Sequence, residues 1–393
     1  MLMELLISLI LIIIGTKLAG HLCQKIGIPA VIGELLTGVI LGPALLGLVL
    51  HTEAISLFAE IGVILLMFLA GLESDLEKLK KYLKPSVMVA LFGILLPMLF
   101  LSGAAHLFDI PWKEALFLGV IFSATSVSIS VQVLKEYNRL DTAEGSVTLG
   151  AAVVDDIAVV LIVSIFSAVL SSGSSGGSSM GVGFIWDLLG SKILFFLGLF
   201  LFAKFILNPL LALVKKIVAV EVETAFGLVL CFLFAVLSEK VGMSDVIGAF
   251  FIGLLLSKHE SKHRIEHNVS VISYSLFIPV FFVSIGLDIE LSAFKEYALL
   301  IIVFTVLATL TKLIGGYVGG RLTHLDKNQS LIIGAGMVSR GEMALIIVKM
   351  GESLGLINEG LYSAIVVAII LTTLFSPLLI KYAIEKGEKG TTA

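Results

Sequence analysis

The sequence has few charged residues and almost no cysteine. Charged residues make up 14% of its 393 residues, whereas hydrophobic residues make up 58% and the mean hydropathy is +1.10. A soluble core of this size does not need so much apolar sequence, so the composition indicates an integral membrane protein. The formal net charge of −4 is close to neutral and gives no indication of a nucleic-acid partner.

Three further features that the sequence lacks narrow the class of membrane protein. Cys23 and Cys231 are the two cysteines, and both lie in apolar surroundings, so they support neither a disulfide framework nor a thiolate metal site. The first segment lacks the basic start and the cleavage pattern of a signal peptide, so we expect a retained span. The long apolar runs lack the period-two alternation of a transmembrane barrel, which leaves helices.

Apolar runs separated by charged residues, glycine or proline predict about thirteen transmembrane helices. Their expected bounds are 2–20, 29–50, 54–72, 85–106, 113–134, 146–170, 188–214, 221–240, 244–257, 269–287, 297–320, 330–350 and 360–382. A helix of about twenty residues crosses the hydrocarbon core of a bilayer. The predicted fold class is an all-α polytopic membrane protein.

Loop charges orient these spans. Of the 26 lysine and arginine residues, eighteen lie on the side of the C-terminus, four lie on the opposite side, and the other four lie within spans. Because cytoplasmic loops are rich in lysine and arginine, we expect an external N-terminus and a cytoplasmic C-terminus in the plasma membrane.

The chain also repeats itself at an offset of 215 residues. Val31-Ile32-Gly33 with Gly38 matches Val246-Ile247-Gly248 with Gly253, and Gly27 matches Gly242. At the same offset Gly71 falls on Gly286 and Gly119 falls on Gly334. Spans 1–6, the first copy, thus correspond to spans 8–13, the second copy. The seventh span between them makes the copies inverted repeats, an architecture of many alternating-access carriers.

The residues that organise the rest of the sequence are Asp155 and Asp156, near the middle of the apolar run 146–170. Aspartate at that depth costs several kcal/mol and needs compensation. The second copy has Ile370 and Leu371 at the equivalent positions, and Pro97 is the equivalent of Lys312. The fold therefore accepts other residues there, which favours a functional role over packing. A salt bridge that only joins two helices remains the alternative.

Two spans are poor continuous helices. The fifth contains the hydroxyl run from Ser123 to Ser130, which includes Thr125 and Ser126, and its equivalent contains Gly334, Gly336 and Gly341. Hydroxyl side chains compete with the helix for backbone hydrogen bonds, and glycine weakens it. We therefore expect two locally unwound helices that cross near the middle of the bilayer.

Five charged residues then form a predicted buried set: Asp155, Asp156, Lys312, Arg340 and Glu342. Neighbouring helix residues point about 100° apart, so one aspartate can pair with Lys312 while the other faces a cavity. A proton and a small cation would compete for that carboxylate, with Thr125, Ser126 and unwound carbonyls as neutral ligands. Arg340 and Glu342 are predicted to form an ion pair at the crossing. This pair either stabilises the crossing or takes part in ion binding.

At these residues the sequence resembles the monovalent cation:proton antiporter-2 family, the sodium/proton antiporters of the NapA and GerN type. The resemblance covers essentially the whole chain. Its motifs are Ala124-Thr-Ser-Val-Ser128, Val154-Asp-Asp156, Thr311-Lys-Leu313 and Ser339-Arg-Gly-Glu342.

The resemblance implies a homodimer with a fixed panel (spans 1–3 and 8–10) and a moving core (spans 4–6 and 11–13). It also implies that Asp156 carries the ion and that Asp155 forms a salt bridge with Lys312. The expected divisions are 1–80 (panel), 81–170 (core), 171–217 (external linker and connecting span), 218–292 (panel) and 293–393 (core and cytoplasmic tail).

The expected function is secondary antiport of a monovalent cation for protons by alternating access. The cation is sodium, with lithium and potassium as alternatives. Exchange is expected to be electrogenic, and we expect no enzyme activity, no cofactor and no metal beyond the transported cation at Asp156. A sodium-coupled symporter of an organic solute is the main alternative. A channel or an intramembrane aspartyl protease fits less well, since no filter motif is present and the two aspartates are adjacent.

One predicted loop, residues 258–268, has two possible roles. His259, His263 and His267 recur every four residues within 258–268 and would share one face of a helix. They indicate either a solvated cytoplasmic loop or a pH-sensing or metal-binding role.

Overall fold

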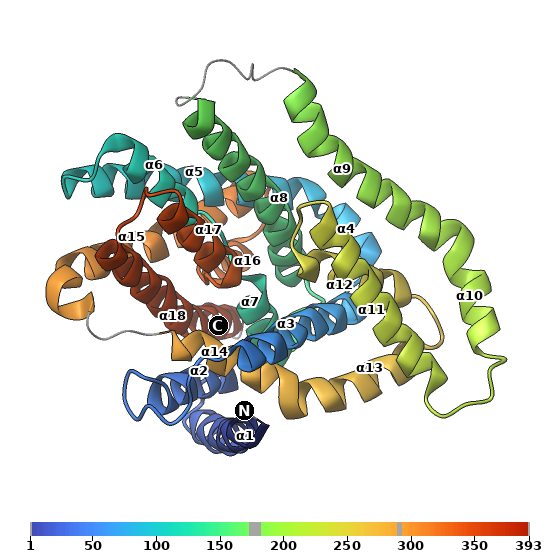
Figure 1. Cartoon of the computed structure of the whole chain (residues 1–393). Coiled ribbons are helices and arrows are strands. Elements are labelled where there is room, and N and C mark those ends of the chain that lie inside the picture. Colours follow the sequence, from blue (N-terminus) through green and yellow to red (C-terminus); the bar gives the residue numbers. More distant parts are fainter. Residues whose placement is uncertain (1, 173–181, 289–292, 392–393) are drawn as a thin grey trace. The chain divides into compact units, whose positions relative to one another are not determined.

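The computed structural model describes residues 2–172, 182–288 and 293–391, and these ranges contain helices and turns but no strand. Figure 1 shows the order of the helices along the chain. The first copy contains α1 (Leu2–Lys25), α2 (Ala30–Leu41), α3 (Glu53–Glu73), α4 (Leu76–Lys81), α5 (Leu83–Leu107), α6 (Trp112–Ile121), α7 (Val127–Glu136) and α8 (Ala143–Ser172).

The connecting segment and the second copy follow in the same all-helical manner. The connecting helices are α9 (Val182–Leu201), η1 (Phe202–Ile206) and α10 (Leu207–Val214). The second copy contains α11 (Val222–Lys240), α12 (Asp245–Leu256), α13 (Lys262–Ile272), η2 (Ser273–Phe277), α14 (Ile278–Leu287), α15 (Ala293–Leu322), α16 (Lys327–Gly336), α17 (Glu342–Ser353) and α18 (Glu359–Thr391).

Helix occupies each of the thirteen predicted spans. Within the described ranges, nine helical segments are long and apolar enough to cross a membrane, and α2 and α12 are shorter apolar helices. The two remaining spans are divided, one into α6 and α7 and the other into α16 and α17. The all-α polytopic fold and both interrupted helices are confirmed.

Several span boundaries were wrong, and two of them differ most from the prediction. The second span was predicted as 29–50, but α2 ends at Leu41 because Gly42 is extended and precedes Pro43, which disfavours helical geometry in the residue before it. The last span was predicted to end at 382, but α18 continues to Thr391. The predicted external linker begins at residue 171, and residues 173–181 lie outside the described ranges.

The chain divides into two compact units, of which the first comprises residues 1–60, 77–159 and 279–393. In this unit α2 crosses α14 at Gly38 and Gly286. A Cβ atom on Gly38 would collide with the carbonyl oxygen of Val283, and one on Gly286 with that of Leu35. Only glycine allows the two backbones to approach so closely.

The second unit comprises residues 61–76 and 160–278 and contains the equivalent crossing. Here α3 crosses α12 at Gly71 and Gly253, where a Cβ atom on either glycine would collide with a backbone oxygen, of Phe250 or of Phe68. These glycines are the ones that the offset of 215 residues pairs with Gly286 and Gly38. Each crossing therefore joins a helix of one copy to a helix of the other.

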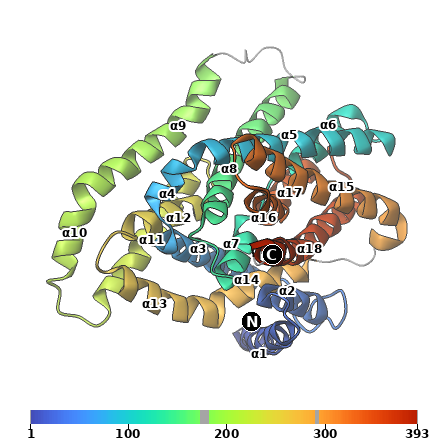
Figure 2. The ribbon, with the colours of Figure 1, turned by 180° about the vertical axis from the view of Figure 1, so that it is seen from behind.

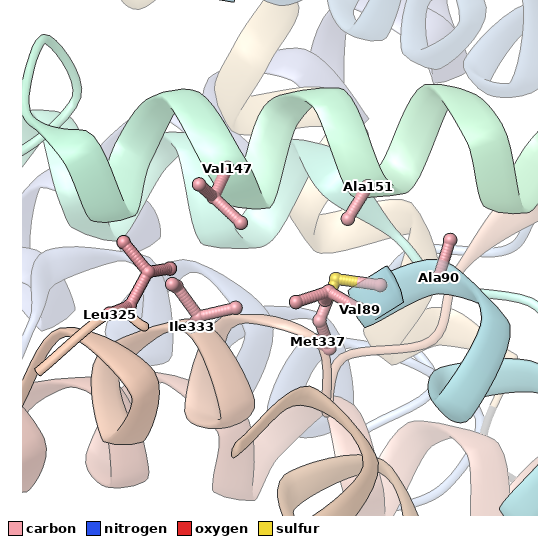
Figure 3. Packing of buried hydrophobic residues seen from close by; sticks show 7 residues of the cluster. All are labelled: Val89, Ala90, Val147, Ala151, Leu325, Ile333 and Met337. Carbon is pink, nitrogen blue, oxygen red and sulfur yellow. The ribbon is translucent and has the colours of Figure 1, made fainter. Parts of the chain in front are cut away.

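The core of the first unit orients α8. In that unit α15 packs on α5, α16 and α18, as the two opposite views show (Figures 1 and 2). A cluster of buried side chains joins α5, α8 and α16 (Figure 3). Its members are Val89, Ala90, Val147, Ala151, Leu325, Ile333 and Met337. Val147 and Ala151 lie four residues apart on the inner face of α8, and Asp155 is the next residue on that face.

Candidate functional site

The two interrupted helices meet at their breaks. Residues 122–126 separate α6 from α7, and residues 337–341 separate α16 from α17 (Figure 2). The backbone N–H of Ser126 donates to the carbonyl oxygen of Ser339 at 2.8 Å, and the Ser339 hydroxyl donates to the carbonyl of Ser126 at 2.6 Å. The unwound segments thus satisfy part of each other's backbone, which a break at bilayer depth requires.

Asp155 and Lys312 form an ion pair beside this crossing. The Nζ atom of Lys312 lies 3.1 Å from Oδ2 of Asp155, and both side chains are 0% exposed. Lys312 Nζ also donates to the Thr125 hydroxyl at 2.6 Å, and that hydroxyl donates to the same carboxylate oxygen of Asp155. A buried pair is maintained only with such added hydrogen bonds, because desolvation offsets much of its attraction.

Thr125 takes part in this ion pair, and its prediction as a neutral cation ligand stays a prediction. Its hydroxyl bridges the two charged groups from the break between α6 and α7, so it orients the ion pair. Asp156, the next residue on α8, is 7% exposed and projects about 100° away from Asp155 around the helix. The structure thus joins Asp155, Thr125 and Lys312 directly and places Asp156 at their edge.

Several buried oxygens near the breaks have no hydrogen-bond partner. They are Oδ1 of Asp155 and the hydroxyls of Ser126 and Ser128. Buried polar atoms in proteins are nearly always paired, so each such atom calls for an explanation. Carboxylate and hydroxyl oxygens are the ligands of monovalent cations and also accept protons or water. The role of Ser126 as a neutral cation ligand stays a prediction.

The guanidinium of Arg340 donates hydrogen bonds to backbone carbonyl oxygens. The side chain is 0% exposed, and its Nε and Nη2 atoms donate to the carbonyl of Phe122 at 3.0 and 2.8 Å. Further bonds reach the carbonyls of Val338 at 2.8 Å and Ala308 at 2.9 Å. The guanidinium thereby satisfies the carbonyl end of α6. The side chain of Glu342 lies outside the described residues, so its predicted pairing with Arg340 stays a prediction.

A set of hydroxyls that was not predicted to belong to the site joins the two breaks. Ser130 donates to the carbonyl of Gly336 and lies 3.1 Å from the Ser339 hydroxyl, and Thr373 donates to the carbonyl of Arg340. The hydroxyl run itself was the available signal for Ser130. For Thr373 the signal was a pair of threonines, 372 and 373, in an otherwise apolar span.

The three histidines do not share a helix. His263 and His267 lie on α13, whereas His259 lies in the preceding turn. The pKa of His259 is lowered, first by burial and second by the charge of Lys215. In the part of the chain that the structure describes, no group of three His, Cys, Asp or Glu side chains is arranged to hold a metal ion.

Comparison with known proteins settles the family. Residues 7–384 match the family described as sodium/hydrogen exchanger, transmembrane. The chain belongs to this exchanger family. A Na(+)/H(+) antiporter of Enterococcus hirae is 48% identical over 386 residues, covering 98% of this chain and 99% of the relative.

A second relative and a solved structure are also similar to this exchanger chain. The Na(+)/H(+)-K(+) antiporter GerN of Bacillus cereus is 40% identical over 392 residues and covers 99% of both chains. The structure of the sodium proton antiporter MjNhaP1 from Methanocaldococcus jannaschii at pH 8 superposes with a TM-score of 0.63 at 17% identity. That superposition covers 99% of this exchanger and 98% of MjNhaP1, and it shows a shared fold.

Proposed function

We propose that the protein is a secondary antiporter that exchanges Na⁺ for protons by alternating access. The observation that carries the proposal is the Asp155–Lys312 ion pair, fully buried beside two interrupted helices and next to a second carboxylate, Asp156. The second copy of the repeat has no such charges at the equivalent positions, so the ion pair serves an activity rather than the architecture. Membership of the exchanger family and the names of its relatives support the same activity.

In this proposal Asp156 carries the transported ion. When its carboxylate is protonated, the site holds no charge for a cation, and when it is deprotonated, its oxygens bind Na⁺. A cation and a proton therefore exclude each other at one group, and this competition couples their movements. Ser126 supplies a neutral ligand, while Asp155 and Thr125 hold the ammonium of Lys312 nearby.

Lys312 acts as a second proton carrier in the same cycle. A cation at Asp156 weakens the attraction between Asp155 and Lys312, and a buried ammonium that loses its partner releases its proton. Each cycle then moves two protons against one cation. Exchange is electrogenic and responds to the membrane potential.

The division into moving and fixed parts is the one that the resemblance to the antiporter-2 family implies. Residues 81–170 and 293–393 form a core that carries the site, and residues 1–80 and 218–292 form a panel through which two copies of the chain dimerise. Residues 171–217 connect the two halves. The lysine and arginine bias supports a plasma-membrane protein with an external N-terminus and a cytoplasmic C-terminus.

The test is proton movement in sealed proteoliposomes when Na⁺, Li⁺ or K⁺ is added in turn. The wild-type protein is expected to release internal protons on addition of Na⁺, whereas Asp156→Asn is expected to lose at least about 99% of that rate because the amide cannot be protonated. Asp141→Asn is the matched control, since Asp141 is an exposed carboxylate that pairs with Lys78. Wild-type exchange by Asp156→Asn would refute the assignment. Sodium uptake that depends on an organic solute, without proton counterflow, would establish the symporter instead.

A further inference from the structure

The N-terminus of α2 is capped by a side chain from another helix. The residue before the helix is Pro29, and α2 has no capping side chain of its own. The backbone N–H of Ala30 instead donates to both carboxylate oxygens of Glu136, at 3.2 and 3.1 Å, and Gln24 Nε2 lies 3.5 Å from the same carboxylate. Glu136 is the last residue of α7. A carboxylate at this place satisfies free N–H groups and favours the positive end of the helix.

In the second copy of the repeat, the N-terminus of the equivalent helix is capped by a side chain of the helix itself. Its helix α12 is equivalent to α2, and Asp245 at its start accepts a hydrogen bond from the N–H of Val246 at 2.9 Å. The position equivalent to Glu136 is Gly351, which has no side chain to reach another helix. Capping alone therefore does not require a contact between α2 and α7. The first copy has an added connection that the architecture does not need.

Helix α7 connects this contact to the candidate ion site. Its N-cap, Ser126, lies at the crossing, and its last residue, Glu136, holds α2. A helix of ten residues is about 15 Å long and moves as one piece. A shift of the site that carries Ser126 along therefore also shifts the carboxylate of Glu136.

We propose that Glu136 is a latch that holds the transporter in the state open to the outside. The inference rests on the proposed function, in which α7 belongs to the core and α2 to the panel. Lys25 and Lys135, beside the two partners, lie on the side expected to face the cytoplasm. A hydrogen bond of 3.1 Å between a fixed and a moving part exists in one of the two states. With the contact made, core and panel are joined at the cytoplasmic face, so that face is closed.

Removing the latch shifts the balance toward the state open to the cytoplasm. The apparent affinity for a ligand scales with the fraction of protein that is competent to bind it. In Glu136→Ala we expect the half-saturating Na⁺ concentration to fall about three- to fivefold at the cytoplasmic face and to rise by up to about twofold at the external face. The measurement is Na⁺-dependent proton exchange in inside-out and right-side-out vesicles.

Asp245→Ala is the matched control, because it removes a carboxylate cap from the equivalent helix without touching a second one. It is expected to lower thermal stability about as much as Glu136→Ala while leaving both half-saturating concentrations unchanged. A Glu136→Ala protein whose two values stay the same, or move in the same direction, would show that Glu136 is a helix cap and no latch.

A covalent version of the contact tests the idea without relying on a loss of binding. Cysteines at positions 30 and 136, in a background with Cys23 and Cys231 replaced by serine, are joined by a short bis-methanethiosulfonate reagent. We expect exchange to stop on cross-linking and to return on reduction. Exchange that continues unchanged after complete cross-linking would overturn the latch. Wild-type protein without Na⁺-dependent proton exchange would instead contradict the proposed function, so the two failures are distinguishable.

Discussion

The two copies of the repeat break the same helix at equivalent places but fill the break differently. The interruptions at 122–126 and 337–341 are related by the offset of 215 residues. At one position of the break the first copy has Thr125, and the second copy has Arg340. Thr125 bridges a buried ion pair, whereas Arg340 donates to backbone carbonyls.

The copies also contribute opposite charges to one crossing. The two aspartates come from the first copy, and Lys312 and Arg340 come from the second. The shared breaks belong to the architecture, because both copies retain them. The charged residues that the copies do not share have two kinds of role. Arg340 donates hydrogen bonds to backbone carbonyls, whereas Asp155 and Lys312 form an ion pair with each other. Variants can separate these two roles.

The largest expected effect concerns Arg340. Arg340→Ala removes the side-chain donors to the carbonyls of Phe122 and Val338 and one of the side-chain donors to the carbonyl of Ala308, and we expect the free energy of unfolding to fall by about 3–5 kcal/mol. Thermal stability in detergent measures this loss. Arg264→Ala is the control, because that arginine is largely exposed and its removal is expected to cost less than about 1 kcal/mol. Equal stabilities of the two variants would remove the structural role of Arg340.

The second effect concerns charge movement. Lys312→Gln removes one of the two proposed proton carriers and retains Asp156, so we expect exchange to fall at least about tenfold and the residual exchange to be electroneutral. The experiment measures transport in vesicles held at different membrane potentials by a method independent of potassium. A variant as sensitive to voltage as the wild type would show that Lys312 only positions Asp155. Wild-type exchange that is indifferent to voltage would have the same meaning.

The third effect compares the two glycine crossings. Gly38→Ala and Gly253→Ala each push a methyl group into a backbone oxygen, so each is expected to cost about 1–3 kcal/mol of stability. Gly103→Ala on α5 meets no atom within 4 Å and serves as the control. A large cost at one crossing and none at the other would show that the crossings are not equivalent.

The smallest effect concerns the loop beyond the α2–α14 crossing. His51 Nδ1 lies 2.5 Å from Asp288 Oδ1, and this hydrogen bond, together with the charge of Asp288, raises the pKa of His51. Its contribution to stability is complete below the ordinary histidine pKa of about 6.5 and is lost as pH rises through the raised value. We expect His51→Gln to cost less than about 1 kcal/mol at pH 6 and nothing at pH 9. A cost that grows with pH would contradict the pairing.

Sequence patterns predicted the spans, the repeat and both breaks because each depends on residue type alone. Apolar length marks a span, and hydroxyls or glycines mark a break. The partners of Arg340 were not predictable, since carbonyl acceptors are present at every residue and only the folded chain selects three of them. The hydrogen bonds of Thr125 to Asp155 and Lys312 were not predictable for the same reason, since only the folded chain selects these partners. Gly42-Pro43 indicated that α2 ends early. The apolar residues that follow, up to Leu50, instead led to the prediction of a longer span.

The glycine crossings have a consequence for how the chain matures. Gly38 meets Gly286, and Gly71 meets Gly253, so each contact waits for a helix that is synthesised much later. Until the second half is synthesised, the glycine faces of α2 and α3 have no helix packed against them. Contacts between residues so distant in sequence also form slowly. The nascent protein therefore passes through a long-lived, half-built stage in the membrane. Ribosome-bound chains that end before residue 253 should be digested by proteases far more readily than chains that extend beyond residue 286.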